Sequence, residues 1–172
     1  MKLVIASDIH GSAAWCKRLM DVIERESPDN VVLLGDLLYH GPRNPLPDAY
    51  APAEVADMLN GIAERILAVR GNCDAEVDQM VLDFPCMADS TTIFDGTRRL
   101  FCTHGHVFDP ACPPQLPAGT AFLSGHTHVK VNEERNGVLF VNPGSVALPK
   151  DGTHSYALYE NGLFDLRILA DA

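Results

Sequence analysis

Five polar motifs in this chain each follow a short hydrophobic run, and this repeated arrangement limits the fold more than any other feature. The motifs are Ser7-Asp8-Ile9-His10-Gly11, Gly35-Asp36, Gly71-Asn72-Cys73-Asp74, His104-Gly105-His106 and Gly125-His126-Thr127-His128. Continuous apolar runs are typical of strands that are buried on both faces. Because polar ligands gather at the carboxyl ends of strands in α/β sheets, the motifs predict a shared site with metal-binding side chains.

The first half of the chain has the pattern of a parallel α/β sheet. Apolar runs at residues 2–7, 31–35 and 66–70 predict three buried strands. Helically spaced apolar residues predict helices at about 12–26, with Ser12 as the N-cap, and at about 53–63. The resulting β-α-β-α-β order favours right-handed crossovers between parallel strands.

The second half is expected to be rich in strands and largely antiparallel, after a short helix near residues 76–82. Hairpin signals are present at Asp95-Gly96, Asn136-Gly137 and Asn161-Gly162. The strands expected around them are 91–94 with 99–103, 129–133 with 138–142, and 156–159 with 164–169, and a further strand is expected at 121–124. We therefore expect one α/β domain over residues 1–172, with two packed sheets and outer helices.

Composition excludes several classes of protein. A chain of 172 residues that is 47% hydrophobic can bury one sizeable core. It has no apolar stretch long enough to span a membrane, and the first apolar run is too short for a signal peptide, so a cytoplasmic protein is expected. Five cysteines without a C-x-x-C pair argue against a disulfide framework or a thiolate zinc site.

The net charge of −10 bears on the partner. An acidic surface opposes the phosphate backbone of nucleic acids, whereas bound cations would make the site itself locally positive. We expect a small anionic substrate, no nucleic acid and no membrane. A homo-oligomer formed through exposed hairpin edges stays possible.

The five motifs, in this order, resemble those of the calcineurin-like metallophosphoesterase superfamily. The stretches His40-Gly41-Pro42-Arg43-Asn44, 69–74 and Asn142-Pro143-Gly144-Ser145 resemble its YfcE-type phosphodiesterase subgroup. The resemblance covers roughly residues 2–150. It implies a four-layer α/β/β/α sandwich of two mixed β-sheets flanked by helices.

The resemblance also implies two sets of metal ligands that share one carboxylate, Asp36. The first set is Asp8, His10, Asp36 and His128; the second is Asp36, Asn72, His104 and His126. Nitrogen and oxygen donors of this kind suit manganese, zinc, iron or nickel, and Mn²⁺ is the expected metal. A hydroxide that bridges the two cations would attack phosphorus.

Catalytic roles are expected for Asp36, Asn72 and His104, and also for Cys73 and His106. Many relatives carry a histidine at the position of Cys73, and it helps to protonate the leaving oxygen. A thiol with a pKa of about 8.5 is a poor substitute, so hydrolysis should favour aryl diesters. Cys73 as a covalent nucleophile is the rival interpretation, which has no accompanying base motif.

Three further side chains have less specific interpretations. His106 could sit by the phosphate or orient a ligand. Arg43 could contact phosphate or be a solvated loop residue. His40 and His154 are expected to be structural or exposed.

The expected function is that of a metal-dependent phosphodiesterase acting on small substrates. A phosphomonoesterase of the same fold is the main alternative, and a nuclease is disfavoured by the acidic charge. A binding module that resembles the retromer subunit of this fold is the alternative from another class. Against it, all seven ligand positions hold residues able to bind a metal.

Overall fold

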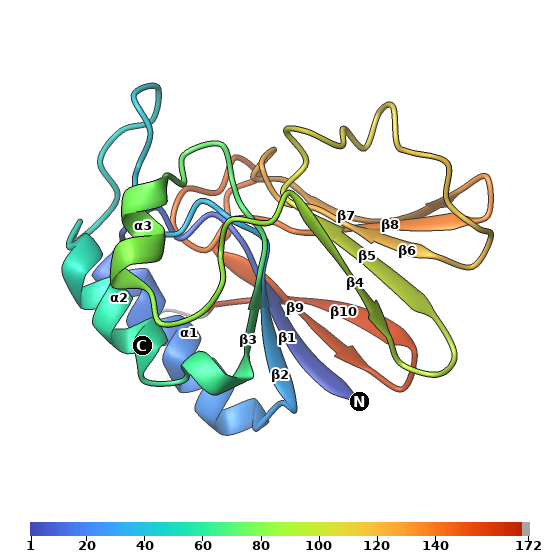
Figure 1. The fold of residues 1–172 in the computed structure, drawn as a ribbon, viewed down its shortest axis with the longest axis horizontal. Coiled ribbons are helices and arrows are strands. Elements are labelled where there is room, and N and C mark those ends of the chain that lie inside the picture. Colours follow the sequence, from blue (N-terminus) through green and yellow to red (C-terminus); the bar gives the residue numbers. More distant parts are fainter. Residues whose placement is uncertain (170–172) are drawn as a thin grey trace.

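The computed structural model describes residues 1–169, which form two five-stranded sheets packed face to face (Figure 1). The first sheet has the order β10-β9-β1-β2-β3. Its strands are β1 (Lys2–Ala6), β2 (Asn30–Leu33), β3 (Ile66–Ala68), β9 (Ser155–Glu160) and β10 (Leu163–Ile168). The first three are parallel, as the sequence predicts, and β9 lies antiparallel beside β1.

The second sheet has the order β4-β5-β6-β8-β7. Its strands are β4 (Ser90–Phe94), β5 (Arg99–Thr103), β6 (Ala121–Leu123), β7 (Lys130–Arg135) and β8 (Val138–Pro143). The hairpins β4–β5 and β7–β8 are antiparallel, but β6 is parallel to both of its neighbours, β5 and β8. The expectation of a largely antiparallel second half is therefore wrong for the centre of this sheet. The long connections on either side of β6 return the chain to the same end of the sheet, which a tight turn cannot do.

The α-helices are α1 (Ala13–Glu26), α2 (Pro52–Asn60) and α3 (Glu76–Val81), and a short 3₁₀ turn, η1, spans Ala63–Arg65. Helices α1 and α2 cover the outer face of the first sheet (Figure 1). Ser12 caps α1 as predicted, because its hydroxyl accepts the N–H of Trp15 at 3.4 Å. Helix α2 ends at Asn60, three residues earlier than expected, and Gly61 is its C-cap. No helix among residues 1–169 has the length and apolar character needed to cross a bilayer.

Alternating side chains of the first sheet form two separate cores. Val4 and Ala6 of β1 pack against the helices, whereas Leu3 and Ile5 face the second sheet. All four are fully buried. This period of two explains why the strand sequence is continuously apolar.

The outer face of the second sheet carries a row of aromatic rings instead of a helix. Phe122 lies between Phe101 and Phe140, and Phe108 of the connection 104–120 packs edge-on against Phe101. The predicted architecture of two mixed sheets flanked by helices is confirmed. The α-helices that the structure describes all lie toward the first sheet, and an irregular segment covers part of the second (Figure 1).

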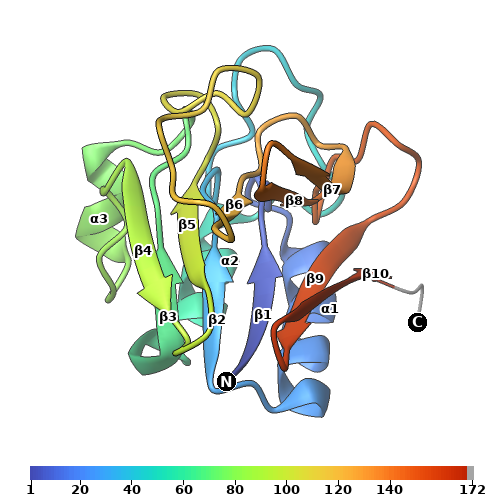
Figure 2. The same ribbon diagram turned by 90° about the vertical axis from the view of Figure 1, so that its right-hand side faces the viewer.

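The three predicted hairpin turns are present. Asn136-Gly137 and Asn161-Gly162 have positive φ at both residues, the backbone of a type I′ turn. The turn at Asp95 is longer, and its carboxylate accepts the N–H groups of Thr97 and Arg98. Strands β1, β2 and β5 run in the same direction, so their carboxyl ends meet at one end of the molecule (Figure 2).

Candidate metal centre

The seven predicted ligands all lie in loops that follow strands of the two sheets. Asp8 and His10 follow β1, Asp36 follows β2, Asn72 follows β3, His104 follows β5, and His126 and His128 follow β6. Five of them are buried, His126 is half-buried and Asn72 is exposed. The structure thus brings together all the residues that the motifs predicted, at the junction between the sheets.

The backbone of these loops is strained. Nine residues other than glycine have positive φ within the part of the chain that the structure describes, and five of them are predicted ligands: Asp8, His10, Asp36, His126 and His128. This left-handed conformation is unfavourable for residues with a Cβ. Strain that clusters in this way is typical of functional sites, where the surrounding structure holds the chain in place.

The donor atoms form two groups. In the first, Nε2 of His128 lies 3.2 Å from Oδ1 of Asp8 and 3.3 Å from Nε2 of His10. Nε2 of His10 lies 3.7 Å from Oδ2 of Asp36. This group contains the four ligands expected for the first cation.

In the second group, Nε2 of His104 lies at the centre. It is 3.2 Å from Oδ1 of Asn72, 3.2 Å from Nδ1 of His126 and 3.4 Å from Oδ2 of Asp36. The same oxygen of Asp36 therefore borders both groups.

Hydrogen bonds to the main chain fix which nitrogen of three histidines faces the site. Nδ1 of His10, His104 and His128 lies at 2.8, 2.6 and 2.6 Å from a carbonyl oxygen. These carbonyl groups belong to Tyr39, Leu34 and Leu148, respectively. Because a carbonyl oxygen only accepts, Nδ1 carries a proton, and in the neutral imidazole Nε2 keeps the lone pair that a metal ion would bind.

With these imidazoles neutral, the site places hydrogen-bond acceptors next to one another without a donor between them. The lone pairs of His10 and His128 face each other, and the buried Oδ1 of Asp8 has no hydrogen-bond donor. A buried acceptor without a donor is costly unless a cation satisfies it. The residues present fit divalent metal ions, and their nitrogen and oxygen donors suit manganese, zinc or iron without selecting one.

Electrostatics at the centre also favour bound cations. Burial works against the charged form of Asp36, but its hydrogen bond and attraction to His104 prevail and hold the pKa of this carboxyl well below its usual range. Burial likewise opposes charge on His104, yet Asp36 and Asp8 raise its pKa to about 9. Burial also opposes the charged form of Asp8, but His128 and His104 lower the pKa of this carboxyl. Both carboxylates thus stay ionised in a buried site, where a metal ion can replace the proton that His104 shares with them.

Asp74 has a role that the sequence did not reveal. Its buried carboxylate accepts the main-chain N–H groups of Asp36, Leu37 and Gly71 at 2.8, 2.8 and 2.7 Å. Burial raises its pKa to about 6, against these hydrogen bonds. Asp74 therefore joins the loops after β2 and β3 and positions Asp36.

Ser145 is a second positioning residue. Its hydroxyl donates to the carbonyl oxygen of Asp8 at 2.9 Å and accepts the N–H of Leu148 at 2.9 Å. Leu148 in turn provides the carbonyl group that orients His128. The sequence singled out this stretch only by resemblance, because the contact of Ser145 with Asp8 joins residues 137 positions apart.

Known proteins share both the sequence and the fold. The family model for the calcineurin-like phosphoesterase superfamily domain matches residues 1–161. The chain is 46% identical to Phosphodiesterase YfcE of Escherichia coli strain K12, over 99% of this chain and 94% of that protein. The chain belongs to the calcineurin-like phosphoesterase superfamily. The expected class of enzyme, a phosphoric diester hydrolase, is supported by both findings.

Solved structures agree with this membership. The structure of Yfce, a phosphoesterase from E. coli, superposes with a TM-score of 0.96 at 45% identity and covers 98% of this chain and 93% of that one. Vacuolar Protein Sorting 29 from Cryptosporidium parvum has a TM-score of 0.62 at 16% identity and covers 97% and 95%. The second likeness shows a shared fold alone.

Cys73 lies beside this phosphoesterase centre. Its main-chain N–H donates to Oδ1 of Asp36 at 2.8 Å, and its sulfur accepts the amide of Asn72 at 3.2 Å. The sulfur is also near enough to His10 and Asp36 for the three to form a compact group of possible ligands, which the sequence did not predict. Burial and the neighbouring Asp36 raise the pKa of this thiol to about 12, which disfavours a thiolate ligand or nucleophile.

The less specific histidines lie in different settings. His106 packs against the rings of His104 and His126 with centroid distances of 5.3 and 6.3 Å, and its buried Nδ1 has no hydrogen-bond partner. His154 stacks on Trp15, so its structural interpretation is confirmed. His40 packs edge-on against two tyrosines, and its buried Nδ1 is also without a partner.

The centre opens into a polar cavity of about 780 Å³. Besides several ligands, Arg43, Asn44 and Lys150 line it. A guanidinium and an ammonium at the entrance suit an anionic substrate.

Proposed function

We propose that this chain is a metal-dependent phosphodiesterase that hydrolyses small phosphodiesters at a centre of two divalent ions. One observation carries the proposal: two groups of nitrogen and oxygen donors meet at a single oxygen of Asp36. The relative with 46% identity, Phosphodiesterase YfcE, supports phosphodiesters as the substrate class.

The proposed ligands divide as the donor atoms do. Asp8, His10, Asp36 and His128 hold one ion, and Asp36, Asn72, His104 and His126 hold the other. Mn²⁺ is the proposed metal, since carboxylate and carboxamide oxygens are hard donors. Two such ions would supply a hydroxide nucleophile at neutral pH and would neutralise charge on the phosphate oxygens.

The chain itself contributes orientation and charge. Main-chain carbonyl groups fix the imidazoles, and Asp74 holds the loop that carries Asp36. Arg43 and Lys150 line the polar cavity, where they attract the phosphate and hold it near the ligands. With a thiol at position 73, leaving groups that depart without a proton are favoured.

The proposal is tested by hydrolysis of bis(4-nitrophenyl) phosphate beside 4-nitrophenyl phosphate, each with Mn²⁺ and with a chelator. We expect turnover that requires the metal and favours the diester. A preference for the monoester would instead indicate a phosphomonoesterase. No turnover by folded, metal-loaded protein would indicate a binding module of this fold.

A further inference from the structure

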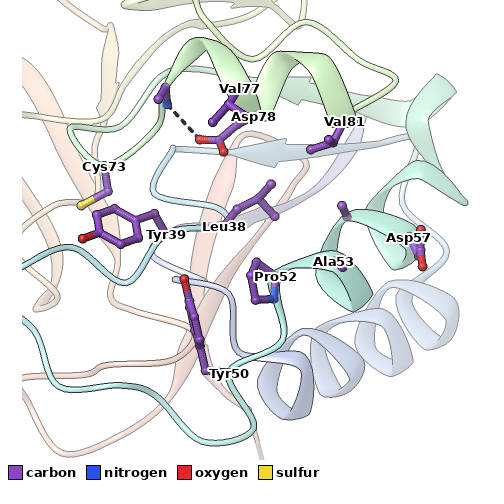
Figure 3. Close-up of a pocket in the computed structure, with 12 residues that line it drawn as sticks. Leu38, Tyr39, Tyr50, Pro52, Ala53, Asp57, Cys73, Val77, Asp78 and Val81 are labelled. Atoms are coloured by element: carbon purple, nitrogen blue, oxygen red, sulfur yellow. Dashed lines mark hydrogen bonds between the residues drawn. The ribbon is translucent and has the colours of Figure 1, made fainter.

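A second cavity, of about 590 Å³, lies next to the proposed centre (Figure 3). It is formed by α2, α3 and the loop after β2, and its wall is mostly apolar. Val77 and Val81 enter it from α3, one helical turn apart, and are 60% and 49% exposed. Tyr39 and Tyr50 provide aromatic surface on the opposite side (Figure 3).

The cavity adjoins the polar cavity of the metal centre. Tyr39 and Cys73 line both this cavity and the polar one. The carbonyl group of Tyr39 also accepts Nδ1 of His10. A molecule whose phosphate lies at the ligands therefore has the apolar cavity within reach of its ester group.

The two cavities differ in the charged side chains that line them. Arg43 and Lys150 lie in the polar one, whereas the apolar one has no basic side chain in its lining. Of its two carboxylates, the buried one of Asp78 caps α3 by accepting the N–H of Ala75 at 2.8 Å, and Asp57 lies at the end far from Cys73 (Figure 3). An anionic phosphate is thus directed to the polar cavity, and an uncharged apolar group is favoured in the other.

We propose that the apolar cavity binds the leaving group of the phosphodiester, and that this group is an apolar aromatic alcohol. This inference rests on the proposed function and deepens it. Hydrolysis forms a bond from phosphorus to the oxygen of water and breaks the bond to the aryl oxygen. The aromatic alcohol departs with the electron pair as a phenolate, and the proton of water passes to solvent.

Two features of the cavity support an aromatic alcohol over an aliphatic one. The rings of Tyr39 and Tyr50 offer edges and faces for ring contact, while Val77 and Val81 offer flat apolar surface. Where the two cavities meet, the wall provides the thiol of Cys73 and the phenol of Tyr39. Neither is an imidazole, the most frequent general acid, so a leaving group that is stable as an anion suits this position.

The first test compares two substrates whose leaving groups have similar acidity and differ in apolar size. They are methyl 4-nitrophenyl phosphate and the analogue with a propyl group on the ring. Each buried CH₂ is worth roughly fourfold in affinity, so partial burial of the propyl group should lower KM by about tenfold, with kcat changed little.

Variants on one helix locate the effect. The double substitution Val77→Ser with Val81→Ser keeps the site's charge and should abolish the KM advantage of the propyl substrate. Met80→Ser lies on the same helix, is 83% exposed and is outside the cavity lining, so it should retain the advantage. A binding measurement needs no metal: 4-propylphenol added to metal-free protein should shift the methyl NMR signals of Val77 and Val81.

The outcomes separate this inference from the proposed function. If both diesters are hydrolysed but the double variant keeps the propyl preference, or the phenol shifts neither valine, the leaving-group role is wrong and the phosphodiesterase stands. If the phenol binds beside α3 but neither diester is hydrolysed by the Mn²⁺-loaded protein, the proposed function is overturned, and the leaving-group role with it.

Discussion

Asp36 is the residue on which both groups of ligands depend. Its Oδ2 lies 3.4 Å from Nε2 of His104 and 3.7 Å from Nε2 of His10, while its Oδ1 accepts the N–H of Cys73. Gly71 makes room for this carboxylate, because a Cβ at position 71 would overlap it. The absence of a side chain at Gly71 is thus a requirement of the site.

We expect Asp36→Asn to remove metal from both sites, because one oxygen serves the two groups. Elemental analysis should give two ions per chain for the natural protein and less than one for the variant. Asp21→Asn, an exposed change on α1, is the matched control and should keep two ions. Two ions retained by Asp36→Asn would exclude the bridging role.

Cys73→His should restore a proton donor beside the leaving group. A general acid is worth roughly 10²-fold or more, so turnover of diesters with alkyl leaving groups should rise by about that factor. Aryl diesters should change little, since a phenolate departs unaided. The paired kcat values decide the matter, and equal values for the alkyl substrates would contradict the account, provided that the variant is folded and metal-loaded.

The residues proposed as ligands could be located in the sequence because each motif is local: a short polar loop after an apolar run. The contacts that orient these side chains were not predictable from the sequence. Asp74 reaches the main chain of Asp36, and Ser145 reaches that of Asp8, only because loops from distant parts of the chain meet. Nothing in the local sequence of these two residues marks such partners.

At the scale of secondary structure, features set by neighbouring residues were again predictable, and features set by residues far apart in the sequence were not. The Asn136-Gly137 and Asn161-Gly162 turns were predictable because the two residues themselves favour positive φ. The parallel pairing of Leu100 with Ala121 and of Leu123 with Val141 depends on long connections, which carry no comparable signal. The aromatic row on the outer face of the second sheet escaped prediction for the same reason.

One carboxylate links the end of α1 to the central strand of its sheet and to one edge strand. Glu26 pairs with Lys2 of β1 at 3.0 Å and with Arg167 of β10 at 2.9 Å. The hydrogen bond from Lys2, aided by Arg167 and opposed by burial, lowers the pKa of Glu26. A lowered pKa in the folded state stabilises the protein above the unfolded pKa of about 4.3, and this contribution is lost as the pH falls.

Glu26→Gln should therefore lower the free energy of unfolding at pH 7 by about 0.5–1 kcal/mol, the range of a partly exposed ion-pair network. As the pH falls through the lowered pKa of Glu26, its carboxyl becomes protonated, so the difference between variant and natural protein should shrink. Urea titrations at pH 7 and pH 3 measure the free energy of unfolding of the variant and of the natural protein. Glu24→Gln, an exposed change on the same helix, is the control. A constant deficit at both pH values would show that packing, not charge, is lost.

At the scale of the whole molecule, the candidate metal centre lies where loops from the two sheets meet. Asp8 and Asp36 follow strands of the first sheet, whereas His104 and His126 follow strands of the second. Cations held by both sheets stabilise the packed state over the unfolded chain. The strain in the ligand loops indicates that part of this stabilisation holds the backbone in place.

Removal of the metals should therefore lower the melting temperature. At a free Mn²⁺ concentration of about 100 times Kd, each site contributes roughly 2.7 kcal/mol to the free energy of unfolding. In a chain of this size, each site therefore raises the melting temperature by about 5–10 °C. Calorimetry with Mn²⁺ and with a chelator measures the shift. The Asp36→Asn protein should show almost none. An equal Tm in both conditions would mean that the metals do not hold the sheets together.

The most direct test of the account is anomalous diffraction from crystals of the Mn²⁺-loaded protein. We predict two peaks about 3.5–4 Å apart, both in contact with Asp36, one beside His10 and the other beside His104. A single peak, or two peaks that share no ligand, would contradict the two-metal centre on which the proposed function rests.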